Sequence, residues 1–193
     1  MPTTYETAFF SREVYNDEPL NLLSSWIVLP IEGKNLVDGY MGRAYINHEK
    51  HEVILAHRGT DDSMFNIFGN ALLPEQAAFT HELANEGDWF QNKLIALKIK
   101  PEQIADADNF SSEIHEFLRK GDLSSYRITH TGHSLGGALA QLQGVKEGVH
   151  VDTYASPGMS EIIVKMKSEG EISDINYFLG EKQIRNFAVG HDV

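Results

Sequence analysis

The sequence predicts an α/β fold with a mostly parallel central sheet, and three observations support this prediction. Short β-type runs alternate with helical patterns along the second half of the chain. One run, residues 53–56, is almost continuously apolar, which is typical of a strand buried on both faces. Another run, residues 125–131, leads through a glycine-rich turn into a helical pattern. We expect a single domain over residues 1–193, because this length suffices for one core.

The N-terminal region predicts a helix followed by an antiparallel hairpin. Residues 8–26 carry a helical pattern. Residues 39–47 and 52–57 are two β-type runs joined by a short polar turn, which indicates a hairpin. The core candidates of the first helix are Tyr15, Leu20, Leu22 and Leu23.

Two helices are expected before the glycine-rich turn. Residues 74–98 have a helical pattern that is interrupted near Gly87. Residues 101–120 give a better helix, with Pro101 in its first turn and Gly121 after its end. Its apolar side is formed by Ile104, Ile114, Phe117 and Leu118.

After the turn, the pattern predicts a helix that stops at Gly148 and a strand over residues 149–155. A further helix is expected at 159–167 and a last strand at 183–189. Ligands of such sheets bind at the carboxyl ends of the strands. The residues that fall at these ends are Thr60, Ser134, Ser156 and Asp192.

The glycine-rich turn matches the pattern G-x-S-x-G of a nucleophile elbow. Gly132 and Gly136 flank Ser134, and small residues at these positions let the backbone approach closely on either side of a strained turn. The following helix directs its N-terminal N–H groups at whatever the hydroxyl attacks, so the Leu135 N–H is expected to be one oxyanion donor. The alternative is a glycine-rich turn in which Ser134 merely caps the helix.

The composition argues against several classes of function and of functional site. The net charge of −12 argues against nucleic-acid binding and against electrostatic docking on anionic lipid, although a local patch leaves transient contact with a membrane surface open. Without cysteine there is no disulfide, thiolate metal site or cysteine nucleophile. The N-terminus has no Sec-type signal pattern, and no apolar run is long enough to span a bilayer. We therefore expect a soluble protein, and both the cytoplasm and export without such a signal stay open.

Four segments in order resemble the class 3 lipase family of α/β-hydrolases. They are HRGT at 57–60, TGHSLGGALA at 131–140, YASPG at 154–158 and NFAVGHDV at 186–193. The resemblance covers roughly residues 35–193. It implies an α/β-hydrolase fold and a serine hydrolase that cleaves carboxylic esters of lipid-like substrates without metal or organic cofactor. Triacylglycerol lipase, phospholipase A1 and small-ester esterase are equally compatible with these segments.

The resemblance also implies roles for individual residues. Ser134 would be the nucleophile, the Thr60 and Leu135 N–H groups the oxyanion hole, and Asp192 the acid of the triad. His57 departs from the family, where this position usually holds Phe, and it would be buried beside the oxyanion loop. His133 is expected to pack beside the serine or orient it rather than act as base, because its adjacency points the ring elsewhere.

Alternatives remain for three of these features. Thr60 could close a turn or cap the segment after it, and Asp192 could be a solvated residue near the chain end. An apolar set after the oxyanion loop forms either a lid, an acyl-chain groove or ordinary helix packing. It consists of Met64, Phe65, Ile67, Phe68, Leu72, Leu73 and Phe79.

The histidine of the expected triad is missing from its usual place. In α/β-hydrolases the order along the chain is Ser, Asp, His. Here none of the nine histidines follows Asp192, and His191 directly precedes it. Either the chain is part of a longer protein that supplies the histidine, and the sheet is incomplete at its C-terminus, or it is a naturally short or degenerate member. In the first case, an open sheet edge beside residues 183–189 favours self-association.

Two function classes are compatible with these residues. We expect an ester hydrolase whose 193-residue chain alone is weakly active or inactive, because loss of the base costs on the order of 10⁶ in turnover. The alternative is a non-catalytic hydrolase-fold module that binds a protein or lipid partner. A serine peptidase or acyltransferase on the same scaffold is disfavoured by the HRGT segment.

Overall fold

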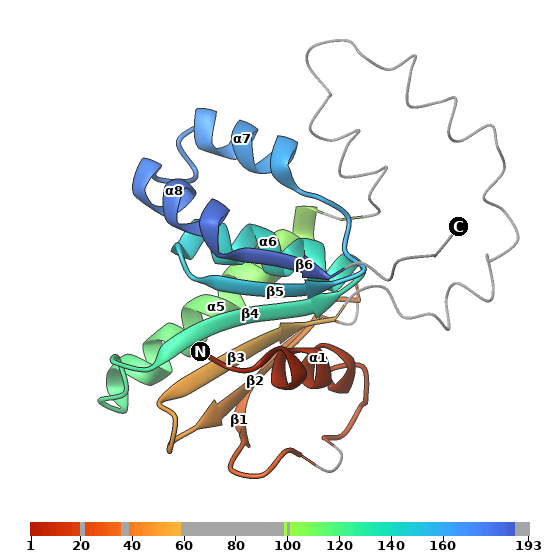
Figure 1. The fold of residues 1–193 in the computed structure, drawn as a ribbon, viewed down its shortest axis with the longest axis vertical. Coiled ribbons are helices and arrows are strands. Elements are labelled where there is room, and N and C mark those ends of the chain that lie inside the picture. The colour runs from red at the N-terminus through yellow and green to blue at the C-terminus, as the bar shows by residue number, and fades with distance from the viewer. Residues whose placement is uncertain (20–21, 36–38, 59–98, 100, 188–193) are drawn as a thin grey trace, which may run out of the picture.

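The computed structural model describes residues 1–193 except 20–21, 36–38, 59–98, 100 and 188–193. The described strands form one six-stranded sheet in the chain order β1-β2-β3-β4-β5-β6. Helix α1 lies on one face, and α5 to α8 lie on the other side (Figure 1). The elements are α1 Thr4–Glu13, β1 Ile27–Lys34, β2 Met41–Asn47, β3 Glu52–His57, α5 Pro101–Lys120, β4 Arg127–His133, α6 Leu135–Glu147, β5 His150–Tyr154, α7 Ser160–Ser168, α8 Asp174–Gln183 and β6 Ile184–Phe187.

The strand directions confirm the predicted sheet. Strands β1, β2 and β3 pair antiparallel, whereas β3, β4, β5 and β6 pair parallel. The predicted hairpin is β2–β3, with Asn47 opposite Glu52 next to the turn. In the parallel part, His57 pairs with Gly132, and His133 pairs with Tyr154. The carboxyl ends of β3, β4 and β5 therefore lie side by side at one edge of the sheet.

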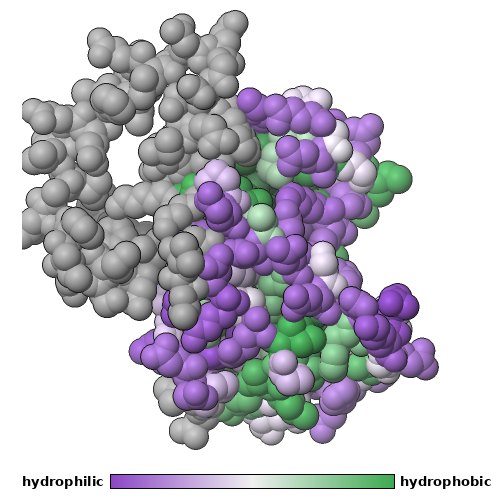
Figure 2. Space-filling model, turned by 180° about the vertical axis from the view of Figure 1, so that it is seen from behind, coloured by the Kyte–Doolittle hydropathy of each residue, from purple (hydrophilic) through white to green (hydrophobic). Residues whose placement is uncertain are grey.

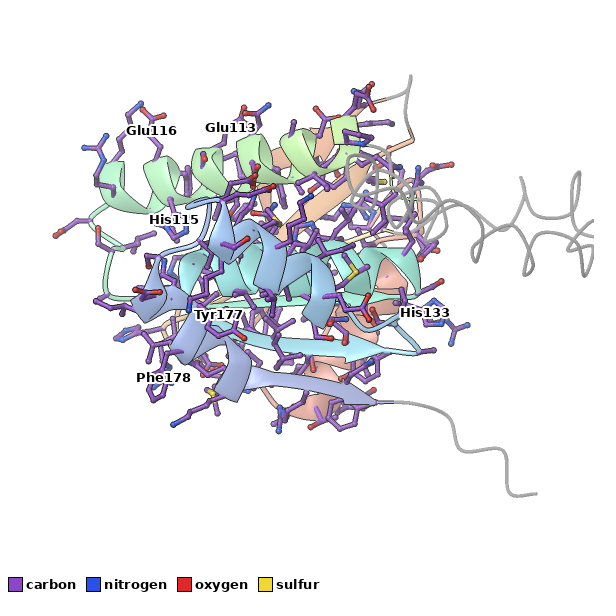
Figure 3. The ribbon with its side chains drawn as sticks, turned by 90° about the horizontal axis from the view of Figure 1, so that it is seen from above. Glu113, His115, Glu116, His133, Tyr177 and Phe178 are labelled. Carbon is purple, nitrogen blue, oxygen red and sulfur yellow. The ribbon has the colours of Figure 1, made fainter. Side chains whose placement is uncertain are left out.

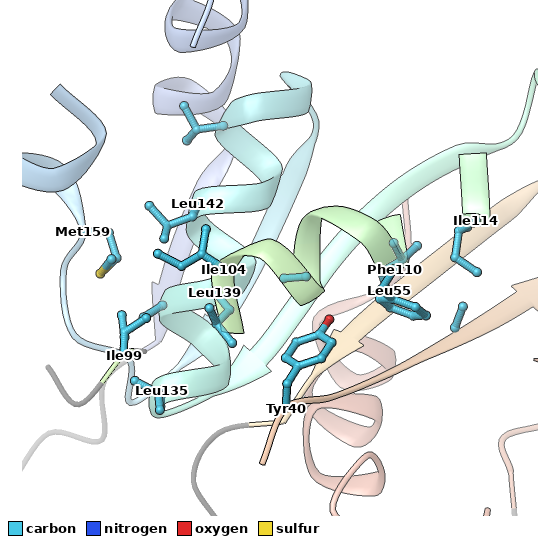
Figure 4. Packing of buried hydrophobic residues seen from close by; sticks show 14 of the residues in the cluster. Tyr40, Leu55, Ile99, Ile104, Phe110, Ile114, Leu135, Leu139, Leu142 and Met159 are labelled. Carbon is cyan, nitrogen blue, oxygen red and sulfur yellow. The ribbon is translucent and has the colours of Figure 1, made fainter. Parts of the chain in front are cut away.

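Strand β3 is buried on both faces, as its apolar run predicts. Ile54 and Ala56 pack in the cluster under α1, while Val53 and Leu55 pack in the larger cluster on the opposite face. Figure 4 shows this larger cluster, which joins Leu55 with residues of α5 and α6. Alternate side chains of β3 thus pack into two separate cores, because successive side chains of a strand point to opposite faces of the sheet.

Strand β1 was not predicted from the sequence. Pro30 lies inside it, and a proline cannot donate a hydrogen bond to a neighbouring strand. The strand tolerates proline because it is at the edge of the sheet, and its register with β2 shifts between Val28 and Glu32. The local sequence therefore did not indicate this strand, because a proline is acceptable in a strand only where the strand lies at the edge of a sheet.

The prediction of a first helix over 8–26 is wrong in both bounds. Helix α1 begins at Thr4, where the Thr3 hydroxyl accepts from the Glu6 N–H and the Glu6 carboxylate accepts from the Thr3 N–H. This capping box is a local sequence signal for an earlier start. The helix ends at Glu13. Of the expected core residues, Tyr15, Leu22 and Leu23 are partly buried, and Leu20 lies outside the described residues.

Most elements predicted after residue 100 are confirmed. Helix α5 has the predicted bounds, and α6 stops where predicted, with Gly148 after its last residue Glu147 in the left-handed conformation, at a φ of 69°. Strand β5, helix α7 and strand β6 overlap the predicted segments at 149–155, 159–167 and 183–189. Helix α8 was missed, although the Ser173 hydroxyl caps it by accepting from the Asn176 N–H. The segment 74–98 lies outside the described residues.

The surface on the side of α5 is mostly hydrophilic, with smaller hydrophobic patches (Figure 2). Among the described residues, Val164 of α7 and Ile175, Phe178 and Leu179 of α8 are exposed apolar side chains. None of the described helices is both long and apolar enough to span a bilayer.

The buried Asp152 of β5 generates a prediction on acid stability. Burial alone would raise the pKa of its carboxyl group, but hydrogen bonds from His150, Arg185 and Thr7 lower the pKa to about 2. Because this value lies below the ordinary 3.8, the carboxylate stabilises the fold above that pH, and the contribution is lost as pH falls toward 2. We expect Asp152→Asn to flatten this part of the pH dependence of the urea midpoint. The control Asp174→Asn, at an exposed carboxylate, should keep the wild-type pH dependence.

Candidate active site

Ser134 stands at the sharp turn between β4 and α6. Its φ is 53° and its ψ is −125°, a conformation that non-glycine residues rarely adopt. Its side chain is exposed, and its backbone N–H donates to the Tyr154 carbonyl at 3.0 Å. Its hydroxyl forms no cap hydrogen bond with α6. Ser134 thus occupies the N-cap position of α6 without capping the helix through its side chain.

Two glycines beside Ser134, Gly132 of the motif and Gly137 of α6, are required by close contacts. A Cβ on Gly132 would lie 2.4 Å from the carbonyl carbon and oxygen of Gly136. A Cβ on Gly137 would lie 2.6 Å from the Cβ of Ser156. Both distances are shorter than carbon atoms tolerate. The turn therefore has room only for residues without a side chain at these two positions.

Leu135 is the first residue of α6. Its side chain is 7% exposed and packs in the larger core cluster. The first N–H groups of a helix have no partner within the helix, and the helix dipole makes this end positive. No acidic residue occupies the first turn of α6 to compete for these groups. The position thus suits an N–H donor to an oxyanion beside Ser134.

A second turn, after β5, lies against the elbow. Gln141 of α6 donates from its side chain to the Ser156 hydroxyl at 2.8 Å and to the Pro157 carbonyl at 3.0 Å. Asn186 of β6 donates to the Ser156 carbonyl at 2.9 Å. Sequence reasoning placed Ser156 at a strand end but missed both partners. They come from distant segments, so no local pattern indicated them.

His133 is exposed at the carboxyl end of β4, at the end of the sheet toward which the parallel strands point (Figure 3). Its ring meets Tyr15 edge to face, with centroids 6.4 Å apart. The Tyr15 hydroxyl donates to the His133 carbonyl at 3.3 Å. This arrangement agrees with a packing role for His133. Tyr15, which was expected only as a core residue, lies beside the candidate site.

His57 is fully buried at the end of β3, as expected for its position. Its ring nitrogens contact the Tyr40 hydroxyl at 3.0 Å and Nδ1 of His130 at 2.9 Å. Burial and the neighbouring His130 lower the pKa of His57 well below its ordinary value, against the opposing effect of Glu147. His57 is therefore neutral at physiological pH.

Five of the seven histidines that the structure describes form side-chain hydrogen bonds, all to partners other than the Ser134 hydroxyl. Their side-chain hydrogen bonds join His48 to Tyr126, His57 to Tyr40 and His130, His115 and His130 to Glu147, and His150 to Asp152. Thr60, Asp192, His81 and His191 lie outside the described residues, as does the apolar set from Met64 to Phe79. Within the described part of the chain, no group of three His, Cys, Asp or Glu residues is arranged to hold a metal ion.

Comparisons with known proteins identify the family of the chain and its fold. Residues 6–193 match a phospholipase-like family described as the Tle-like phospholipase domain. The chain belongs to this family. No curated protein matches the sequence of this Tle-like domain.

Solved lipases share the fold of the Tle-like domain. It aligns over 86% of its length with 62% of the lipase from Rhizopus microsporus var. chinensis, at 15% identity and a TM-score of 0.53. For the Lip2 lipase of Yarrowia lipolytica, 80% of the domain aligns with 58% of that chain, at 20% identity and a TM-score of 0.51. A triacylglycerol lipase whose catalytic centre is formed by a serine protease triad aligns over 96% of the domain and 69% of its own chain, at 16% identity and a TM-score of 0.54. The domain thus spans about three-fifths of the length of the first two lipases, and these likenesses show the α/β-hydrolase fold.

The strain at Ser134 predicts that Ser134→Gly stabilises the domain. A positive φ at a non-glycine residue costs about 1–3 kcal/mol, and glycine adopts it freely. After the entropy cost of a glycine, about 0.5–1 kcal/mol, we expect a net gain of about 1 kcal/mol in the free energy of unfolding. Urea denaturation measures it. Ser134→Ala is the control, since it removes the hydroxyl but keeps the Cβ. Equal stability of the two variants would contradict the strain.

The contact between Gly137 and Ser156 predicts a compensating pair. Gly137→Ala should destabilise the domain by about 1–3 kcal/mol, because its Cβ would overlap the Ser156 side chain. Ser156→Gly removes the overlapping atoms, so the double variant should lose less stability than the sum of the two single variants. A double-mutant cycle in urea measures this coupling. Simple additivity would show that the clash is relieved elsewhere.

Proposed function

We propose that this Tle-like domain is a serine hydrolase that cleaves carboxylic esters of lipids, with Ser134 as nucleophile. The observation that carries the proposal is the exposed Ser134 hydroxyl at a strained turn, beside the N-terminus of α6. A serine used only for structure would not require positive φ, two close glycine contacts and an uncapped helix start. Membership in a phospholipase-like family supports a phospholipid or related lipid ester as the substrate.

The reaction follows from these groups. The Ser134 oxygen adds to the ester carbonyl carbon while a histidine takes the hydroxyl proton. The carbonyl oxygen becomes an oxyanion, held by the Leu135 N–H and, in our proposal, the Thr60 N–H, each worth about 2.7–4 kcal/mol. The intermediate then collapses and expels the alcohol, which takes the proton from the imidazolium. Water attacks the acyl-serine in the same way, releases the carboxylic acid and restores the serine. No metal or organic cofactor takes part.

We further propose that Asp192 orients the imidazole and that this histidine is supplied from outside these 193 residues. The buried His57 and His130 bond to each other, and His150 bonds to Asp152. His133 lies beside Ser134, but its ring meets Tyr15. On this proposal the 193-residue chain alone turns over esters weakly, since the unassisted hydroxyl is a poor nucleophile.

The missing base predicts rescue by free imidazole. In the 193-residue chain, hydrolysis of p-nitrophenyl butyrate should rise with imidazole concentration, because a diffusing imidazole can take the Ser134 proton. Imidazole also hydrolyses this ester in solution, so the enzymatic part is the difference between wild type and Ser134→Ala. Ser156→Ala, at the neighbouring hydroxyl, is the matched control and should keep the imidazole-dependent rate.

Two outcomes would contradict these proposals. Equal rates for wild type and Ser134→Ala at every imidazole concentration would exclude Ser134 as nucleophile and favour a binding module. Fast turnover without imidazole that Ser134→Ala abolishes would keep the nucleophile but place the base within these residues.

A further inference from the structure

A continuous chain of hydrogen bonds crosses the core beneath α5. It runs from the Tyr40 hydroxyl to His57 Nδ1 at 3.0 Å, and from His57 Nε2 to His130 Nδ1 at 2.9 Å. It continues from His130 Nε2 to Glu147 Oε2 at 3.1 Å. His115 also bonds to Oε2 at 2.9 Å, and the Ser111 hydroxyl donates to Oε1. Tyr40, His57 and His130 are at most 1% exposed.

The charge of Glu147 fixes the direction of the bonds made to its carboxylate. Burial alone would raise the pKa of its carboxyl group, but His130, His115 and Ser111 outweigh burial and lower the pKa, so the group is a carboxylate. A carboxylate only accepts hydrogen bonds, so His130 carries a proton on Nε2. His57, which is neutral, carries one ring proton, so it donates at one nitrogen and accepts at the other. It therefore either donates to His130 and accepts from the Tyr40 hydroxyl, or accepts from His130 and donates to the Tyr40 oxygen.

The chain joins the elements that form the candidate site. His57 is the last residue of β3 and pairs with Gly132, the first glycine of the elbow. His130 precedes Gly132 by two residues on β4. Glu147 is the last residue of α6, the helix that starts directly after Ser134. Its partner His115 lies at the opposite end of the sheet from His133 (Figure 3).

Two buried imidazoles fill a core only if their polar atoms are hydrogen-bonded, a condition that apolar side chains do not have. A polar group that loses its partner in the interior costs about 1–3 kcal/mol, whereas an apolar side chain of similar size has no such requirement. A network in which every group is satisfied admits only one arrangement of its members. At position 57, where the resemblance expects Phe, a histidine therefore tolerates fewer arrangements of its neighbours than an apolar side chain would, and its geometry is fixed.

We propose that His57 and His130 are positioning residues of the hydrolase site, anchored by Glu147, which keeps a proton on His130 Nε2 and, through the hydrogen bond from His130 to His57, holds the end of β3 in place beside the elbow. This inference rests on the proposed function of Ser134. The alternative is that the two rings only fill space between β3, β4 and α5, in which case their tautomers have no effect on the site.

The first test reads the chain without any activity. Long-range proton–nitrogen NMR correlations on protein labelled at histidine distinguish the two neutral tautomers from the cation. Between pH 5 and 8, His57 should stay neutral, and His130 should carry a proton on Nε2, where it donates to Glu147. His115 should titrate with a raised pKa, because its hydrogen bond to Glu147 favours the cation over the effect of burial. A His130 ring without a proton on Nε2, or titration of His57 in this range, would overturn the chain.

The second test uses Glu147→Gln, whose side-chain amide can donate as well as accept and so no longer requires a proton on His130 Nε2. The matched control is Asp108→Asn, which weakens other contacts between the same helices, to Lys146 and Gln143 at 2.8 Å. In Glu147→Gln, the amide of Arg58, which donates to the Met41 carbonyl at 2.8 Å, should exchange its hydrogen faster. The Ser134-dependent, imidazole-driven kcat should fall about 10- to 100-fold with KM unchanged, well below the melting temperature. Asp108→Asn should change neither.

The outcomes separate the two proposals. If wild type shows Ser134-dependent turnover and Glu147→Gln behaves like Asp108→Asn in kcat and in Arg58 exchange, the positioning role is wrong. If wild type shows no Ser134-dependent turnover, the hydrolase function fails and the positioning role fails with it. The NMR result then still decides whether the ordered chain exists.

Discussion

The close approach of β4 to α6 at Ser134 is the constraint on which the rest of the structure depends. The chain passes from strand to helix across one residue, and a Cβ at Gly132 would lie 2.4 Å from the backbone of Gly136. Ser134 adopts a positive φ in this turn, and its side chain is exposed. It directly precedes Leu135, the first residue of α6, whose N–H we propose as an oxyanion donor. The strain and the proposed reactivity of Ser134 thus have one origin.

The packing of α6 offsets the cost of this turn. Leu135, Leu139 and Leu142 are buried in the larger core cluster, each worth about 1.5–3 kcal/mol in transfer from water. The helix also approaches β5 so closely that a Cβ on Gly144 would lie 2.0 Å from Val151 Cγ2. The elbow is therefore strained at one residue, and the helix that follows it is held in place by close packing. Such local strain persists only where the surrounding structure enforces it.

The sequence predicted what local signals determine. The elbow, α5 and α6 each have glycine, proline or apolar spacing at their bounds, and the structure places them accordingly. Strand β1 was missed because its proline is acceptable only at a sheet edge, which is a property of the tertiary structure. The contact between His57 and His130 joins residues 73 apart in the chain, so neither histidine indicated the other. Thr60 and Asp192 stay predictions, because they lie outside the described residues.

The position of Glu147 explains why the buried histidines come as a connected set. A carboxylate at the C-terminus of a helix faces the negative end of the helix dipole, which disfavours its charge. Burial disfavours the charge further, so the low pKa of Glu147 depends on its donors, His130, His115 and Ser111. Removing His130 would take away a donor that keeps Glu147 ionised. Neutralising Glu147 would in turn remove the acceptor that requires a proton on His130 Nε2. Because each member depends on the next, the network is expected to respond to substitution as a unit, with strongly non-additive effects at His57, His130 and Glu147.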